Sequence, residues 1–296
     1  MRAPLAHARA RAAALLVLTG AAACGGEAQQ TDAQLQAAVD SLVPLLESLS
    51  GLEQRGPIHF ARRSRAQLRA FVEEQLAEKL PPEELAGVEA TYRAFGLLPD
   101  TLDLRALLLE LYTEQVVGYY DPARDTLYLV DDVPAADLLD VLAHELVHAL
   151  QDQHADLDAL IDRSRGNDRQ TAAQAAIEGH ATLVMFALQA AALTGGPVDM
   201  AALPNLAAEL RPALEGHNER FPVFRDAPRI VRETLLFPYL GGAGFVQELW
   251  RAAAPDRPAP LGEHLPLSTE QVLHPRARFL QERDEPTEIV LGAADG

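Results

Sequence analysis

The chain has 296 residues, 48% of them hydrophobic and 23% charged, so it can bury a sizeable core and is not disordered along its whole length. Its formal net charge of -18 at pH 7 repels nucleic acid and anionic lipid headgroups, which argues against a nucleic-acid-binding protein. The single cysteine, Cys24, excludes an intramolecular disulfide.

Residues 1–23 have the three-part pattern of a secretory signal peptide. Arginines precede a short apolar run that ends at Leu18, and small residues continue to Ala23. This run is shorter than the roughly 20 residues of a stable membrane span, and we expect no later run to span a bilayer. The pattern predicts a mature protein outside the cytoplasm.

Cys24 lies in the segment Ala21-Ala22-Ala23-Cys24-Gly25, which resembles a bacterial lipobox, in which the cysteine is lipidated and becomes the first residue. Most lipoboxes have Leu in place of Ala21, so a soluble secreted protein cleaved near Ala23 stays open as an alternative. The resemblance implies that a lipid on Cys24 holds the protein at a membrane of the cell envelope, with residues 24–31 as a tether.

A helical region is predicted for residues 32–114. Leucine and valine recur at helical spacing in its first helix, which Pro44 is expected to kink. Later helices are predicted from three start signals: Ser64 with Gln67, Pro81-Pro82, and Thr101 with Asp103.

A second region is predicted for residues 115–296. Residues 116–120 and 126–130 are rich in strand formers and flank a five-residue turn, which predicts a β-hairpin. Further helices are expected at about 135–153, 168–193 and 229–254, the last interrupted by Pro238 and by glycines at 241–244. The predicted fold is mainly α with a small β-hairpin or sheet, of the α+β class.

The motif His144-Glu145-Leu146-Val147-His148 lies in the middle of the helix predicted for 135–153. Positions i and i+4 of a helix differ by about 40° around its axis, so both imidazoles face the same way. Neutral imidazole binds zinc, and Glu145 is placed to reach a water rather than the same metal. Two surface histidines would not explain why these polar residues interrupt an apolar helix face. The motif therefore predicts a zinc site.

A catalytic zinc needs a third protein ligand. We favour Glu178 on the following helix, because a lone carboxylate among alanines is costly to bury unless it is paired or bound to metal. His154 has the spacing of the HExxHxxGxxH motif, but Gln151 replaces the helix-breaking glycine, so a continued helix points His154 away. His180 is the remaining candidate.

The stretch from His144 to Asp152 resembles the active helix of the gluzincin peptidases, the thermolysin-like superfamily. Asp152 stands at the aspartate of their helix signature, and Glu178 at the place of their third ligand. Thr182 departs from the aspartate of the thermolysin pattern, and no thermolysin-type C-terminal helical domain is visible. Thermolysin's substrate range therefore does not transfer to this chain.

A longer pattern resembles a group of uncharacterised bacterial and archaeal proteins regarded as metallopeptidases. It comprises Gly118-Tyr119-Tyr120-Asp121-Pro122, HELVHALQDQ, EGHA and the segment 268–275. Both resemblances imply a zincin-like catalytic core that follows the N-terminal helical region, with a peptide or protein as substrate.

The implied mechanism has Zn²⁺ held by His144, His148 and Glu178, with Glu145 as general base. An oxyanion donor is also needed, and the candidates are His274 and its rivals Tyr119, Tyr120 and Tyr239. Residues 126–130 resemble the edge strand with which gluzincins pair an extended substrate.

The sequence thus predicts a lipid-anchored, extracytoplasmic zinc metallopeptidase. The alternative is a non-catalytic envelope lipoprotein that retains a metallopeptidase fold for binding or assembly. A third interpretation, a secreted helical binding module, requires the HExxH motif to be accidental, and tight zinc binding would remove it.

Overall fold

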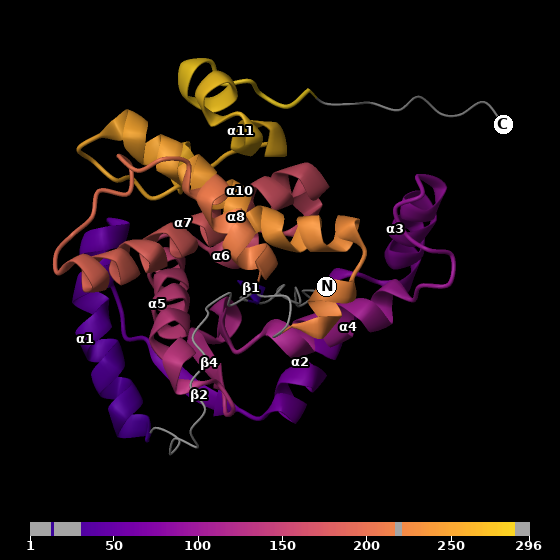
Figure 1. The fold of residues 1–296 in the computed structure, drawn as a ribbon, viewed down its shortest axis with the longest axis horizontal. Helices are drawn as coiled ribbons and strands as arrows, with labels where there is room; N and C mark the ends of the chain where they lie inside the picture. Colours follow the sequence, from indigo (N-terminus) through magenta and orange to yellow (C-terminus); the bar gives the residue numbers. More distant parts are fainter. Residues whose placement is uncertain (1–12, 15–30, 217–220, 288–296) are drawn as a thin grey trace, which may run out of the picture.

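Three long helices lie at the centre of the molecule, where α7 (Asn167–Thr194) packs against α5 (Ala135–Asp152) and also against α10 (Arg229–Ala253) (Figure 1). The computed structural model describes residues 13–14, 31–216 and 221–287, so Cys24 and most of the predicted signal peptide and tether lie outside the described residues. Helix α1 (Asp32–Ser50) packs against both α5 and α7. The predicted α+β class, mainly helical with a small sheet, is confirmed.

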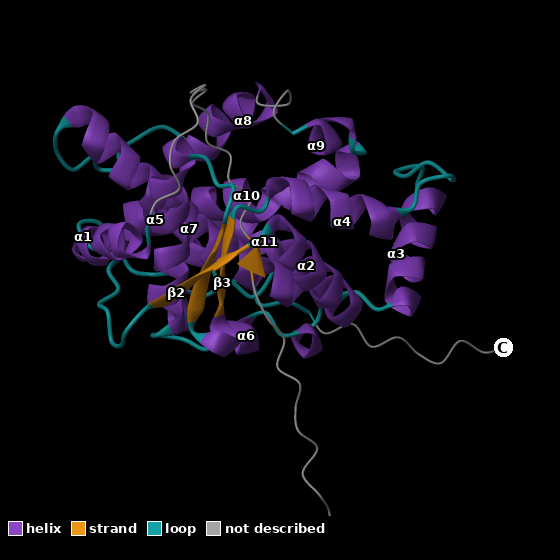
Figure 2. Cartoon of the chain, turned by 90° about the horizontal axis from the view of Figure 1, so that it is seen from below, coloured by secondary structure: helices purple, strands orange, loops and turns teal. Residues whose placement is uncertain are grey.

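A small sheet packs against α5, with the strand order β1-β3-β4-β2. Strand β3 (Gly118–Asp121) pairs antiparallel with β4 (Thr126–Val130), which confirms the predicted hairpin. Strand β2 (His59–Arg63) pairs parallel with β4, and the two-residue β1 (Ala13–Ala14) pairs antiparallel with β3. Figure 2 shows these strands in the middle of the molecule, with helices on both sides.

Strand β2 corrects the expectation that residues 32–114 are helical throughout. Its sequence, HFARR, has no apolar alternation, and all its residues are exposed or half-buried. It is held by the backbone ladder to β4, from His59 opposite Thr126 to Arg63 opposite Val130. Strand β2 lies in one sheet with β3 and β4, and α1 lies in one core with later helices. The division of the chain at residue 115 stays a prediction.

The remaining helices surround this centre, and several begin at the predicted start signals. Helix α2 has the capping box of Ser64 and Gln67, and Asp103 caps α4. Pro44 lies inside α1 without ending it. The other described α-helices are α2 (Arg65–Lys79), α3 (Pro82–Ala94), α4 (Leu104–Gln115), α6 (Leu157–Leu160), α8 (Leu206–Gly216), α9 (Pro222–Asp226) and α11 (Thr269–Leu273).

Helix α7 is long and apolar enough to cross a membrane by length and composition, contrary to the expectation that no later run would be. However, 61% of its most apolar window is buried inside the protein, as in the core helix of a folded domain.

Helix α10 is continuous, although an interruption by Pro238 and the following glycines was predicted. The glycines have a packing role instead. A Cβ atom on Gly242 would lie 1.8 Å from the carbonyl oxygen of Ala175, and one on Gly179 would lie 1.9 Å from the carbonyl carbon of Gly242. The backbones of α7 and α10 therefore touch at a point where any side chain would separate them.

We expect Gly242→Ala to lower the free energy of unfolding by about 1–3 kcal/mol, because overpacking against backbone outweighs the better helix propensity of alanine. Gly87→Ala in α3 is the matched control, since a Cβ there would meet nothing within 4 Å. That control should gain roughly 0.5–1 kcal/mol. Urea denaturation measures both changes, and equal stability of the two variants would contradict the close helix contact.

Candidate metal centre

Helices α5 and α7 bring His144, His148 and Glu178 together in the interior. Nε2 of His144 lies 3.1 Å from Oε2 of Glu178, and Nε2 of His148 lies 3.3 Å from the same oxygen. One ligand atom from each residue lies within 4.8 Å of the others. The i, i+4 spacing on α5 places both imidazoles on the face that α7 covers.

The three residues fit a metal ion. Two imidazoles and one carboxylate are a donor set that zinc takes in catalytic sites. All three residues are at most 1% exposed. Oε1 of Glu178 is buried without a hydrogen-bond partner among the described residues, so this oxygen retains lone pairs to offer a metal.

The charges of this group are set by burial and by mutual attraction. Burial alone would lower the pKa of His148, but the carboxylate of Glu178 raises it to about 9. Burial alone would raise the pKa of Glu178, but the charge of His148 and hydrogen bonds from both imidazoles lower it to about 2. For His144, burial lowers the pKa to about 4. The metal-free protein therefore holds one ion pair, His148 with Glu178, beside a neutral His144.

We expect metal binding at pH 7 to release at least one proton. His148 is protonated below a pKa of about 9, whereas a metal takes only the neutral imidazole, and a cation beside Glu145, whose pKa is about 8, also favours its ionised form. Affinity should rise at least about tenfold per pH unit from pH 6 to pH 8 and level off above pH 9. Calorimetry of zinc binding in two buffers of different ionisation enthalpy measures the released proton. Absence of release at pH 7 would contradict the ion pair.

Glu145 lies beside this group on α5. Its side chain is 0% exposed, and neither carboxylate oxygen has a close hydrogen-bond partner among the described residues. Burial raises the pKa of Glu145 to about 8, while His148 and the backbone amide of Tyr120 oppose that shift. A buried carboxylate costs stability when it ionises, so Glu145 does not stabilise the metal-free fold.

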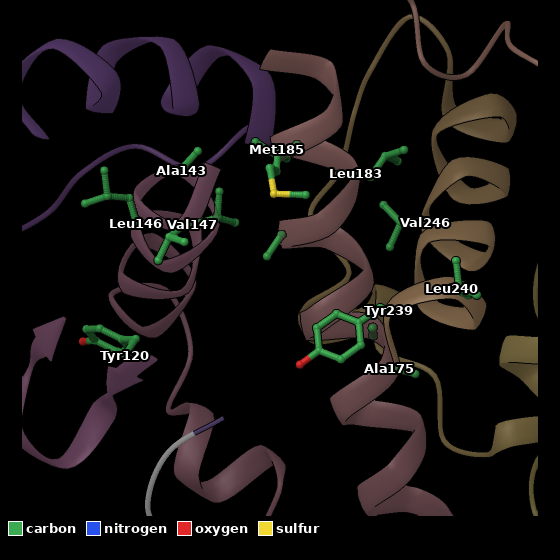
Figure 3. Close-up of a cluster of buried hydrophobic side chains, with 14 of the residues drawn as sticks. Tyr120, Ala143, Leu146, Val147, Ala175, Leu183, Met185, Tyr239, Leu240 and Val246 are labelled. Carbon is green, nitrogen blue, oxygen red and sulfur yellow. The ribbon is translucent and has the colours of Figure 1, made fainter. Parts of the chain in front are cut away.

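Tyr239 of α10 lies close to His144. Its ring centroid lies 6.2 Å from that of His144, and its side chain is buried. In Figure 3 the Tyr239 hydroxyl points toward the side on which α5 lies. The close contact of α7 with α10 at Gly242, one turn further along, holds the ring in this place.

The other two tyrosines are engaged elsewhere. Alternation along β3 turns Tyr120 toward α5 and Tyr119 toward α2. The Tyr120 hydroxyl donates a hydrogen bond to Asp152 at 3.0 Å, which ties β3 to the end of the active helix. Tyr119 stacks between Phe71 and Tyr128 in a separate apolar cluster.

The oxyanion role of His274 stays a prediction, because no contact of His274 with the three residues is seen among the described residues. His274 is exposed at the end of α11 and borders a cavity of about 400 Å³ formed with α8 and α10.

The substrate-pairing strand also needs correction. Strand β4, which covers the predicted residues 126–130, pairs with β3 on one side and β2 on the other, so its backbone is already satisfied. Strand β3, which packs against α5, has the two-residue β1 as its outer neighbour among the described residues.

The two alternative third ligands lie outside the group. His154 follows the end of α5, and its Nε2 lies 2.8 Å from the carbonyl oxygen of Glu53. His180 is buried but faces α1 and Gln151. Gln151 was not predicted as a site residue, although its i+3 spacing from His148 places it on the same face of α5.

No protein-family profile matches the chain, and no curated protein matches it. Among solved structures, the chain is similar to the crystal structure of "a putative hydrolase with a novel fold" from Chloroflexus aurantiacus. The TM-score is 0.40 and the sequence identity 17%, over 86% of this chain and 93% of that chain. A likeness of this size carries no conclusion about fold or activity, so the site is interpreted from its own residues.

Proposed function

We propose that this protein is a zinc-dependent peptidase of the gluzincin type. The observation that carries this proposal is the buried convergence of His144, His148 and Glu178 beside the unpartnered carboxylate of Glu145. Ligands alone would fit a structural metal site. A carboxylate held next to them without a partner fits a general base.

A zinc ion held by these residues supplies Lewis acidity and makes a water nucleophilic near neutral pH. Glu145 accepts the proton of the attacking water and later gives it to the leaving amine. The Tyr239 hydroxyl donates a hydrogen bond to the negative charge that develops on the carbonyl oxygen. Asp152 and Tyr120 fix β3 relative to the active helix.

Strand β3 favours a peptide as the substrate. It lies against α5, and the backbone amide of Tyr120 is close enough to Glu145 to affect its pKa. The two residues that extend the sheet at this position, Ala13 and Ala14, belong to the predicted signal peptide. Removal of that peptide frees the outer edge of β3 for another extended segment, which can add as an antiparallel strand.

Peptide hydrolysis tests the proposal directly. The zinc-loaded protein is incubated with a mixed peptide library, and new termini are identified by mass spectrometry. We expect cleavage that 1,10-phenanthroline abolishes and added zinc restores. If the zinc-loaded protein cleaves no peptide, the non-catalytic alternative takes the place of this proposal.

We also propose that the protein acts outside the cytoplasm, anchored to a membrane of the cell envelope by a lipid on Cys24. The support is the signal-peptide pattern that ends at a lipobox-like segment. Cys24→Ser is expected to move the protein from the membrane fraction to the soluble fraction. Retention of that variant in membranes would count against lipidation.

A further inference from the structure

A chain of buried hydrogen bonds leads from His148 to the end of α1. Nδ1 of His148 lies 2.8 Å from Oε1 of Gln151, and Nε2 of Gln151 lies 3.1 Å from Nδ1 of His180. Nε2 of His180 lies 3.2 Å from the backbone carbonyl oxygen of Ser50, the last residue of α1. His148, Gln151 and His180 are each at most 1% exposed as whole residues.

The carbonyl of Ser50 sets the direction of every bond in this chain. A carbonyl oxygen only accepts, so Nε2 of His180 carries the hydrogen and Nδ1 of a neutral His180 is left as an acceptor. The Gln151 amide nitrogen then donates to His180, and it also donates to the carbonyl oxygen of Ile177 at 3.0 Å. Both amide hydrogens are thereby used, and the Gln151 oxygen is turned toward His148.

The consequence reaches the metal site. The Gln151 oxygen only accepts, so Nδ1 of His148 must donate, and the lone pair of a neutral His148 lies on Nε2, the atom that faces Glu178. If either imidazole ring or the Gln151 amide were flipped, two donors or two acceptors would face each other in the interior and one hydrogen bond would be lost. His180 is held further by Trp250, whose ring meets it edge-on at 5.9 Å.

We propose that Gln151 and His180 are positioning residues that fix His148 in the tautomer whose Nε2 is free for the metal, with the Ser50 carbonyl as the anchor. The inference rests on the proposed metal site. It also gives α1 a function, because α1 must be docked for His148 to be fixed. His144 has no comparable support, since its Nδ1 lacks a partner within the described residues.

The zinc affinity of Gln151→Met tests this role in the purified full-length protein. Methionine keeps the length of the side chain but removes both the acceptor and the donor. We expect the dissociation constant for zinc, measured by competition with a chromogenic chelator, to rise about 10- to 100-fold.

Gln247→Met is the matched control. Gln247 is as buried as Gln151 and donates to the carbonyl oxygens of Met200 and Pro204, but it makes no contact with the metal site. The loss of these hydrogen bonds in Gln247→Met should lower the melting temperature and leave the zinc affinity unchanged. Equal weakening of zinc binding in both variants would show a general loss of stability and would overturn the positioning role.

Nitrogen-15 spectra of the zinc-loaded wild-type protein test the direction of the chain without any substitution. They should show His180 protonated on Nε2 alone and His148 protonated on Nδ1. His180 protonated on Nδ1 would overturn the inference, even if Gln151→Met did not fold. Unchanged zinc affinity in folded Gln151→Met would overturn it while leaving the proposed peptidase intact. A wild-type protein that binds no zinc would remove the metal site and this inference together.

Discussion

Glu145→Gln is expected to abolish peptide hydrolysis while the protein keeps its zinc. Glutamine has nearly the shape of glutamate and leaves the three ligands in place, but it cannot accept the proton of an attacking water. The expected loss in kcat is about 10²- to 10⁴-fold. Zinc content measured on the same sample separates a lost base from a lost metal. Full activity in this variant would rule out Glu145 as general base.

Glu145→Gln is also expected to change the pH dependence of the melting temperature of the metal-free protein. The pKa of Glu145 is raised from 4.5 in the unfolded chain to about 8, so the folded state holds a proton that the unfolded state releases. Stability therefore falls as the pH rises through this window. Glutamine does not ionise, so metal-free Glu145→Gln should melt above the wild type at pH 8 and close to it at pH 4. If metal-free Glu145→Gln melted below the metal-free wild type at pH 8, the result would contradict the raised pKa of a buried Glu145.

Tyr239→Phe is expected to lower kcat by about 10²- to 10³-fold, the usual loss when one oxyanion donor is removed. The phenyl ring keeps the packing between α7 and α10, so zinc content and KM should change little. Only the hydroxyl near the reacting carbonyl is lost.

Tyr119→Phe provides the control for this prediction. Tyr119 is also a buried tyrosine, but it stacks on Phe71 on the far face of the sheet, and its hydroxyl has no partner among the described residues. The activity of Tyr119→Phe should equal that of the wild type. Equal activity of both tyrosine variants would place the oxyanion donor elsewhere.

The parts of the molecule that were predictable from sequence are governed by local rules. The HExxH spacing on one helix places both imidazoles on one face, and the structure has that face buried against α7. Glu178 was favoured because a lone carboxylate in an alanine-rich helix needs a partner, and it lies between His144 and His148.

The parts that were not predictable depend on long-range packing. Strand β2 forms because its backbone pairs with that of β4, and its own sequence has no apolar pattern that predicts a strand. The glycines of α10 indicated an interruption when considered alone, and only the touching backbone of α7 reveals their role. The choice between His274 and Tyr239 likewise depends on where α10 and α11 pack relative to α7.

The central claim is that His144, His148 and Glu178 together hold a zinc ion. Its most direct test is the metal content of the purified protein by mass spectrometry, compared with that of Glu178→Ala after both have been offered zinc. We expect about one zinc per chain in the wild type and a marked loss in the variant, because two imidazoles without the carboxylate make an incomplete site. Folded wild-type protein that retains no zinc would contradict the claim and would leave the buried ion pair as a feature of a non-catalytic protein.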